Sequence, residues 1–537
     1  MRRIPSVAVA ASLLCSTASS VQGQEQTPDW KQGAVCYEIF VRSFHDSDND
    51  GVGDLRGLIE KLDHVNDGSP ASTRDLGATC IWLMPIAASP SYHGYDVTDY
   101  YRIEPAYGTN EDFKQLIAEA HQRGIRVLVD LVLNHASSEH PYFKHALLHP
   151  DSPYRDWFRF APGAGGRNEW GTEVWHRSPV RDEYYYGFFW SGMPDLNLRN
   201  PAVRAETKRI ATFWLRDMGV DGFRLDAIRH LMEEGDQTTN VSANHDFLRE
   251  FAAHVRSVSP DAFTIGEVYD SIGAVLAYYP DQLDSHFAFE VADSIVSAVR
   301  TGSAQGLLAP ALRLQRELPA ERWSPFLRNH DQTRAMTEFG GDIRRARLAA
   351  TILLTLPGLP FIYYGEEVGM TGDKPDPRLR TPMHWNRGPA AGFTRGVPWE
   401  PLQSDSFLAN VEVMDADTAS LLHAYRKLIH LRAADAALGG GELVPLEPNH
   451  PSLVAYLRRA QDRTVFVIAN LAETAISDVR ITSGAATLPG GVYSVGGLLG
   501  APAGQPIRVG GNGRIDRYAP VEAIGGLQAW LFELTRR

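Results

Sequence analysis

Short apolar runs alternate with longer amphipathic stretches over most of the chain. The amphipathic stretches repeat apolar residues at helical spacing, as at 111–124 and 201–219. The apolar runs are predicted strands at about 35–41, 79–84, 125–132, 220–225, 263–267, 284–288, 325–328 and 360–364. Eight strand–helix repeats of this kind predict an α/β fold, a (β/α)₈ TIM barrel of parallel strands with insertions.

Two regions break this rhythm. The segment 134–193 follows the third predicted strand and is rich in His, Pro, Gly and aromatic residues, which is typical of a functional insertion. Beyond about 440 the pattern changes to short alternating strands separated by Gly and Pro. We therefore expect a barrel formed by 24–133 and 194–440, an inserted domain B at 134–193, and a C-terminal antiparallel β-sandwich at 441–537.

The first 23 residues have the profile of a signal peptide. Arg2 and Arg3 precede a short apolar stretch, and a region rich in small residues follows up to Gly23. Cleavage after Gly23 predicts a secreted or periplasmic protein; a lipoprotein anchored through Cys15 is the alternative. No later run approaches the roughly twenty apolar residues of a membrane span.

The charge of the chain narrows the classes of partner. Of the 537 residues, 44% are hydrophobic, which allows a sizeable core, and the net charge is −13. Nucleic acid and anionic membranes call for a basic face, so this balance argues against both. A neutral polymer such as a carbohydrate fits, and we expect a monomer.

Two cysteines remain after removal of the leader, Cys36 and Cys80, in the apolar runs VCYEIFV and TCIWLMP. Neither belongs to a metal-binding spacing. Buried free thiols are favoured over a bridge between them.

Four predicted strands end in polar segments: DLVLNHAS (130–137), GFRLDA (222–227), TIGEV (264–268) and FLRNHDQTR (326–334). The carboxyl ends of barrel strands meet at the active-site face, so charge at these positions indicates chemistry. The segments supply three carboxylates, at Asp226, Glu267 and Asp331. Cleavage of a glycosidic bond needs one ionised carboxylate and one protonated carboxyl group.

Asp226 fits the role of nucleophile, because Arg224 lies two residues earlier on the same strand face and would keep it ionised. Glu267 follows an apolar strand and a glycine, and fits a protonated general acid. Asp331, next to His330, can support positive charge at the anomeric carbon. Taken singly, each group has a structural alternative, namely a buried ion pair, a helix-start Glu or an N-cap residue.

The segment DSDNDGVGDL (46–55) predicts a cation site. Its oxygen ligands would be Asp46, Asp48, Asp50, the carbonyl of Val52, and Asp54, and Ca²⁺ is the natural ion for such a set. We expect a structural ion, away from the catalytic set. A solvated acidic turn is the alternative.

The segments YHGYDVTDYY (92–101) and EVWHRSPVRDEYYYGFFWSG (173–192) are dense in aromatic residues. Aromatic faces stack on sugar rings, although many such residues serve instead as core. We expect Tyr95 and Trp190 to be exposed.

These motifs resemble the α-amylase family of glycoside hydrolases over nearly the whole mature chain. The resemblance implies that Asp226 is the nucleophile, Glu267 the acid/base and Asp331 the transition-state stabiliser. It implies substrate-binding roles for five further residues: Tyr95, Asp130, His135, Arg224 and His330. MPDLN (193–197) is similar to a group intermediate between oligo-1,6-glucosidases and neopullulanases, and the calcium loop resembles that of the same group.

The expected function is therefore hydrolysis of α-1,4-glucosidic bonds in starch or maltooligosaccharides, with retention of configuration. Ala227 after the nucleophile resembles α-1,4-acting members. YHGY resembles amylases rather than strict exo-glucosidases, which often have an acidic residue at the Tyr92 position. An α-glucosidase, or a trehalose synthase or transglucosidase acting on maltose, is the alternative. A catalytically inactive transporter subunit, also related to this family, would carry a true membrane helix and lack the carboxylate set.

Overall fold

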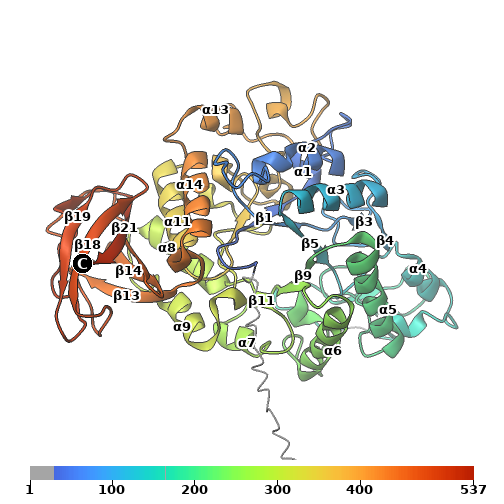
Figure 1. The fold of residues 1–537 in the computed structure, drawn as a ribbon. Coiled ribbons are helices and arrows are strands. Elements are labelled where there is room, and N and C mark those ends of the chain that lie inside the picture. The colour runs from blue at the N-terminus through green and yellow to red at the C-terminus, as the bar shows by residue number, and fades with distance from the viewer. Residues whose placement is uncertain (1–29, 164) are drawn as a thin grey trace, which may run out of the picture.

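The computed structural model describes residues 30–163 and 165–537. The expected signal peptide and Cys15 lie outside the described residues. Figure 1 shows a barrel with its surrounding helices, and a C-terminal β-domain (orange to red) beside it. Within the described part of the chain, no helix is both long enough and apolar enough to cross a membrane.

Seven parallel strands form the barrel sheet, in the order β11-β10-β9-β5-β2-β1-β12. All seven lie within or next to runs predicted from the sequence. Their bounds are β1 (Cys36–Ile39), β2 (Cys80–Leu83), β5 (Arg126–Leu131), β9 (Gly222–Leu225), β10 (Phe263–Gly266), β11 (Ser285–His286) and β12 (Phe361–Tyr363).

The sequence predicts an eighth strand at 325–328, but the structure has no regular strand there, so this prediction is wrong. The chain nevertheless lies between β11 and β12. Ser324 N donates to the carbonyl of His286 at 2.9 Å, and Phe361 N donates to the carbonyl of Pro325 at 2.9 Å. Pro325 has no N–H group to continue a ladder, which explains the irregular segment. These bonds complete the ring of the barrel.

A disulfide joins Cys36 and Cys80, so the prediction of free thiols is wrong. The two residues are register partners on β1 and β2, with Cα atoms 4.3 Å apart, and both are fully buried in the apolar cluster that fills the barrel. They are 44 positions apart in the chain. Only the pairing of the two strands brings them together, which the sequence does not reveal.

Helices cover the outside of the barrel. The predicted helix at 111–124 is α3, which begins with a capping box between Thr109 and Asp112. The predicted helix at 201–219 is α5 followed by a π-helical turn, η2 (Phe213–Met218). The α-helices outside domain B are α1 (Val41–Phe44), α2 (Leu55–Val65), α3 (Asn110–Gln122), α5 (Pro201–Thr212), α6 (Ser242–Val258), α7 (Ile272–Leu276), α8 (Phe289–Thr301), α9 (Ala309–Glu317), α10 (Ala335–Glu338), α11 (Ile343–Thr355), α12 (Asp376–Leu379), α13 (Val411–Ala416), α14 (Leu421–Ala434) and α15 (Ala436–Gly440). Short 3₁₀ turns are η3 (Ile228–His230), η4 (Ala320–Arg322), η5 (Glu366–Val368) and η6 (Pro389–Gly392).

Two insertions rise from the carboxyl end of the barrel. A hairpin, β3 (Ala87–Ala88) and β4 (Asp99–Ile103), follows β2. Between β5 and α5, the chain forms α4 (Pro141–Leu148), η1 (Arg155–Trp157) and a three-stranded sheet of order β6-β8-β7. The bounds of this sheet are β6 (Phe160–Ala161), β7 (Trp175–Arg177) and β8 (Tyr184–Tyr186).

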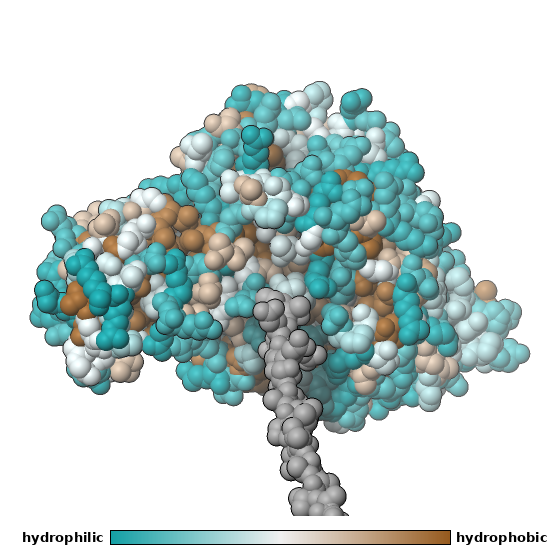
Figure 2. Space-filling model, viewed as in Figure 1, coloured by the Kyte–Doolittle hydropathy of each residue, from teal (hydrophilic) through white to brown (hydrophobic). Residues whose placement is uncertain are grey.

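The C-terminal domain is antiparallel, as the alternating pattern predicts. Its main sheet has the order β17-β13-β14-β15-β21-β18-β19, and β16 pairs with β20 in a second small sheet. Its strands are β13 (Glu442–Pro448), β14 (Leu453–Ala460), β15 (Arg463–Asn470), β16 (Ile476–Ser477), β17 (Ile481–Thr482), β18 (Gly491–Leu498), β19 (Gly504–Val509), β20 (Ala523–Ile524) and β21 (Gln528–Arg536). The domain has its own apolar core and contacts α9, α11 and α15. Hydrophilic residues dominate the face of the molecule in Figure 2, and apolar residues form smaller separate areas.

Candidate active site

The residues proposed for chemistry lie at the carboxyl ends of barrel strands. Asp130 is on β5 and Arg224 on β9, while Asp226 and Glu267 each follow the last residue of a strand, β9 and β10. Asp331 lies beyond the irregular segment between β11 and β12. Parallel strands direct all these positions to one edge of the barrel, so residues far apart in the chain meet there.

One guanidinium connects three of the carboxylates. Arg224 Nη1 donates to Asp226 Oδ1 at 2.6 Å and to both oxygens of Asp130 at 2.8 Å. Arg224 Nη2 donates to Glu267 Oε2 at 2.7 Å. The Arg224 side chain is 1% exposed, whereas those of Asp226 and Glu267 are 10% and 21% exposed. Arg224 therefore fixes two partly accessible carboxyl groups side by side.

Glu267 is held on one oxygen only. Besides Arg224, the backbone N–H of Ala227 donates to Glu267 Oε2 at 3.0 Å. Ala227 can do this because it adopts a left-handed conformation (φ 48°) directly after Asp226, which turns the chain sharply. Among the described residues, no hydrogen bond to Oε1 is found, so this oxygen can carry a proton toward the cavity.

The electrostatic surroundings shift the pKa values of Glu267 and Asp331 in opposite directions. Burial raises the pKa of Glu267; Arg224 opposes the shift, and the charges of Asp226 and Asp331 add to it. Burial likewise raises the pKa of Asp226 against the opposing effect of Arg224. Burial raises the pKa of Asp130 to about 7, because its effect is larger than the opposing effect of the Arg224 charge. More carboxylates than cations share this space, which favours the protonated form of one of the three carboxyl groups.

Asp331 is held ionised. Burial favours its neutral form, but His330 and Arg380 lower its pKa well below the usual range. His330 Nε2 lies 3.1 Å from Asp331 Oδ2, and Arg380 Nη2 donates to Asp331 Oδ1 at 2.8 Å. On the other side of the imidazole, Nδ1 lies 2.6 Å from Glu38 Oε1. The two carboxylates outweigh the burial of His330 and raise its pKa to about 9.

Tyr95 joins the two groups of charged residues. Its hydroxyl lies 2.7 Å from His330 Nε2 and donates to Asp130 Oδ2 at 3.1 Å. Its ring stacks on His330, with centroids 5.7 Å apart. Tyr95 is half-buried, in contrast to its predicted exposure, because these neighbours cover it, whereas Trp190 is 48% exposed. His135 is also buried; burial lowers its pKa to about 4, and among the described residues its Nε2 has no partner.

These side chains open onto a cavity of about 740 Å³. This is an ordinary size for a site that binds a small ligand or part of a polymer. The cavity is lined by His93, Tyr95, His135, Glu169, Trp170, Phe189, Trp190, Met193, Asp226, Ala227, Arg229, His230, Glu267, Tyr269, Asp331, Asp376 and Arg380. Three of the predicted residues are buried and are not part of this lining: Asp130, Arg224 and His330. They contact lining residues and hold them in place.

Several residues of this site were not predicted from the sequence. Arg380 contacts Asp331, and its motif RTPMHWN was noted only as a resemblance. Glu38 supports His330 from β1, where a buried Glu in an otherwise apolar strand is the signal that could have found it. Glu169, Trp170 and Tyr269 lie in loops, and no spacing in the sequence brings them to the cavity.

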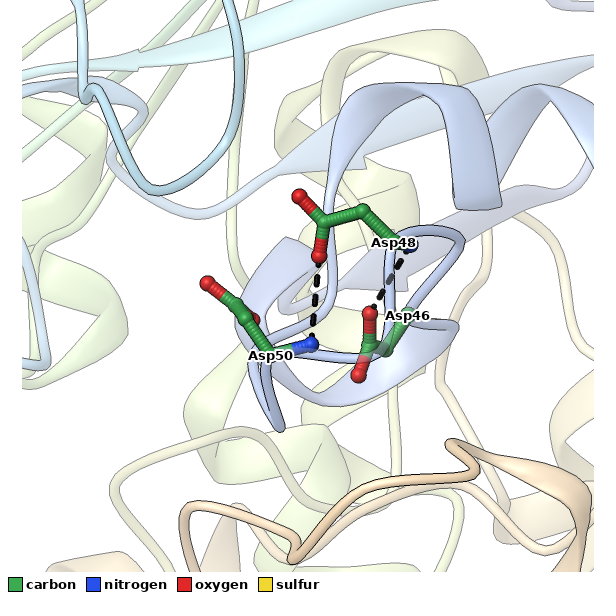
Figure 3. Close-up of side chains that lie close together, drawn as sticks. All are labelled: Asp46, Asp48 and Asp50. Carbon is green, nitrogen blue, oxygen red and sulfur yellow. Dashed lines mark hydrogen bonds between the residues drawn. The ribbon is translucent and has the colours of Figure 1, made fainter.

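In the predicted cation loop, three of the five proposed ligands lie close together. Figure 3 shows Asp46, Asp48 and Asp50 on one turn, and an oxygen from each lies within 4.8 Å of the others. Asp54 instead accepts from Ser47 N at 2.7 Å and Gly57 N at 2.8 Å, and caps α2. A carboxylate oxygen has more than one lone pair, so capping leaves Asp54 able to contact an ion. Hard oxygen donors with this clustering fit Ca²⁺.

Comparison with known proteins identifies the family. The model of the α-amylase catalytic domain matches residues 38–441. The chain belongs to the α-amylase family. "Alpha-amylase 3" of Dictyoglomus thermophilum is 42% identical over 449 residues, covering 82% of this chain and 85% of that protein. The crystal structure of an α-amylase from H. orenii is 39% identical with a TM-score of 0.80, and the match covers 94% of this chain and 99% of that one.

Relatives with other names are also similar. "Trehalose synthase/amylase TreS" of Mycolicibacterium smegmatis is 35% identical over 489 residues, covering 80% of each protein. Further relatives are named oligo-1,6-glucosidase and trehalose-6-phosphate hydrolase. The family thus establishes an enzyme that hydrolyses glycosidic bonds, whereas the bond that it prefers has to be argued from the site.

Proposed function

We propose that this glycoside hydrolase is a secreted, calcium-binding α-amylase that cleaves α-1,4 bonds of starch or maltooligosaccharides by double displacement. The observation that carries the proposal is the pairing of Asp226 and Glu267 on the Arg224 guanidinium at the cavity edge. A retaining mechanism needs two carboxyl groups that both reach one sugar, one as nucleophile and one as acid.

In the first step, an oxygen of Asp226 attacks the anomeric carbon while Glu267 gives its proton to the departing glycosidic oxygen. The bond to the leaving sugar breaks, and a glycosyl ester of Asp226 forms. Glu267, now ionised, takes a proton from water, which attacks the same carbon and releases Asp226. Asp331, already charged, stabilises the positive charge that develops at the anomeric centre.

Two features favour an α-1,4-acting amylase over the alternatives. Tyr92 stacks on Trp399, with centroids 5.3 Å apart, at the position where strict exo-glucosidases of this family often have an acidic residue. Ala227 follows the nucleophile, as in α-1,4-acting members. A trehalose synthase or transglucosidase remains the second candidate, because one relative of similar identity is named "Trehalose synthase/amylase TreS".

A product profile tests the proposal. We expect soluble starch and maltotriose to yield shorter maltooligosaccharides or glucose with initial α-configuration, measured by chromatography and proton NMR. Maltose should yield glucose or remain intact, and the α-1,6 bonds of pullulan should resist. Accumulation of trehalose from maltose would instead establish the second candidate.

Export is supported by the leader pattern at 1–23 and by the disulfide between Cys36 and Cys80. Disulfides form and persist mainly in oxidising compartments. Mass spectrometry of the mature N-terminus tests this part of the proposal. A chain that begins after Gly23 and is found outside the cytoplasm is the expected result, and an uncleaved cytoplasmic chain contradicts it.

We further propose that Asp46, Asp48 and Asp50, with Asp54 and the Val52 carbonyl, hold a structural Ca²⁺. The three clustered carboxylates repel one another without an ion, and an ion would fix the turn against residues 394–399. Thr394 Oγ1 donates to Asp46 Oδ2 at 2.5 Å, and Trp399 N donates to the carbonyl of Gly51 at 2.9 Å. An ion that binds only the folded state stabilises it by mass action.

Removal of Ca²⁺ should therefore lower the melting temperature. Calcium at about 100 times its dissociation constant contributes about 2.7 kcal/mol, which corresponds to about 2–3 °C in a protein of this size. Differential scanning calorimetry with calcium or chelator measures the shift. Asp48→Asn should reduce it, while Asp261→Asn, in an exposed turn, should leave it unchanged. Equal melting temperatures with and without calcium would exclude a stabilising ion.

A further inference from the structure

Three of the four exposed aromatic side chains of the described residues line the catalytic cavity. They are Trp170 (59% exposed), Trp190 (48%) and Tyr269 (59%); the fourth is Phe407. Apolar rings usually avoid water, so their gathering at one cavity indicates a surface for sugar rings. Trp170 and Trp190 come from the inserted domain B, and Tyr269 follows Glu267 by two residues.

An ion pair connects domain B to the barrel beside these rings. Arg229 Nη2 donates to Glu169 Oε1 at 2.5 Å and Oε2 at 2.6 Å. Arg229 Nη1 also donates to the carbonyl of Tyr269, and Asp270 lies 3.5 Å away. The Arg229 side chain is 13% exposed and that of Glu169 is 40% exposed, so water reaches this charged contact mainly from the Glu169 side.

The loop that carries Glu169 and Trp170 is anchored inside domain B by Asn168 and by the Trp170 ring, which packs on Phe188 and Phe189. The buried Asn168 amide donates to the carbonyl of Phe188 at 2.9 Å, and its side-chain oxygen accepts from Trp170 N at 3.1 Å. The Trp170 ring stacks on Phe189 and lies 5.9 Å from His230. Two contacts tie the loop to the barrel: the ion pair between Glu169 and Arg229, and the approach of the Trp170 ring and Glu169 to His230.

In the proposed mechanism, this group of residues would lie on the leaving-group side of the scissile bond. The general acid must face the departing oxygen, and Tyr269 and Arg229 follow Glu267 and Asp226 by two and three residues. Asp331 and Arg380 line another part of the cavity, with His330 behind Asp331. In that mechanism, the leaving sugars would pass between Tyr269 and the domain B loop.

We propose that the Glu169–Arg229 ion pair is a positioning device that holds Trp170 as a stacking surface for the leaving glucose units, and so sets the preference for chain length on that side. The inference rests on the proposed glucan hydrolysis. Glu169 and Arg229 act through Trp170 and Tyr269, not on the reacting atoms. Loss of the pair leaves Asp226 and Glu267 on Arg224 but lets the loop move away from the cleft.

Two substrates separate this role from catalysis. Maltopentaose places glucose units on both sides of the bond, whereas α-maltosyl fluoride has fluoride as leaving group and needs none on the leaving side. For Glu169→Gln and Glu169→Ala, we expect kcat/KM on maltopentaose to fall about tenfold, mainly through KM. Turnover of α-maltosyl fluoride should stay within about twofold of the parent, because the reacting groups are untouched.

Matched variants complete the test. Glu173→Gln removes a carboxylate of the same loop that pairs with Arg167 outside the cavity, and should behave as the parent. Trp170→Ala should reproduce the loss that depends on chain length. Arg229→Lys should show part of it, because Lys lacks the planar fork. Melting temperatures of all variants show whether the fold is intact.

The outcomes are distinguishable. An unchanged kcat/KM on maltopentaose in both Glu169 variants overturns the positioning role. An equal loss on both substrates also overturns it, because the pair would then support the fold or the reacting groups. If the parent enzyme itself cleaves neither substrate, the proposed function fails, and that failure is seen before any variant is compared.

Discussion

Asp226→Asn should reduce the turnover of maltooligosaccharides by about 10⁴-fold or more. The amide cannot form the glycosyl ester on which double displacement depends. In the parent protein, Arg224 Nη1 donates to Asp226 Oδ1 at 2.6 Å. The carbonyl oxygen of the amide can still accept this hydrogen bond, so the fold should persist. Initial rates of reducing-end release on maltopentaose, with melting temperatures of both proteins, measure the effect.

Asp226→Ala should show the same loss and cannot regain a carboxylate by deamidation. The matched control is Asp293→Asn on α8, where the carboxylate is half exposed and pairs with Arg328. It should retain the parent rate. An Asp226 variant that cleaves maltopentaose near the parent rate would remove the assignment of the nucleophile and with it the proposed mechanism.

The barrel could be predicted because its signals are local. Each strand is a short buried run, and seven of the eight predicted runs are strands of one parallel sheet. The positions of Asp226 and Glu267 follow from the same signal, since a carboxylate directly after such a run lies at the barrel edge, and Asp331 follows the irregular segment that takes the place of the eighth strand. Once the topology is known, these residues meet whatever lies between them in the chain.

The features that were missed depend on pairing or on loops. The Cys36–Cys80 bridge needs the register of β1 against β2, which no local pattern contains. The segment at 325–328 looks like a strand, yet Pro325 prevents a regular ladder. Glu169 reaches Arg229 only because domain B folds back over the barrel, a tertiary effect beyond any sequence spacing.

The site also shows how similar carboxyl groups come to differ in charge. Asp331 faces two cationic groups, His330 and Arg380, and stays charged. Asp226 and Glu267 share one guanidinium with the buried Asp130, so that set holds more acid than base. The environment, not the residue type, therefore separates Asp331, which is a fixed anion, from the pair that supplies the nucleophile and the acid.

Glu267→Ala should separate the two halves of the reaction. The variant lacks the acid that protonates a leaving sugar, so turnover of maltopentaose should fall by about 10²–10⁴-fold. α-Maltosyl fluoride needs little protonation at its leaving group, so the first step should remain fast. The second step lacks its base, and the glycosyl ester of Asp226 should accumulate as a mass increase of one maltosyl group on the intact protein.

Azide provides the control for this interpretation, because it is a nucleophile that needs no base. It should restore turnover of α-maltosyl fluoride by Glu267→Ala and yield α-maltosyl azide, whose retained configuration requires attack on the ester of Asp226. The parent enzyme should show no such acceleration. β-Maltosyl azide would mean that azide attacks the substrate directly, and Asp226 would then not be the nucleophile. No product at all would mean that Glu267 supports the fold of the site and does not act as its acid.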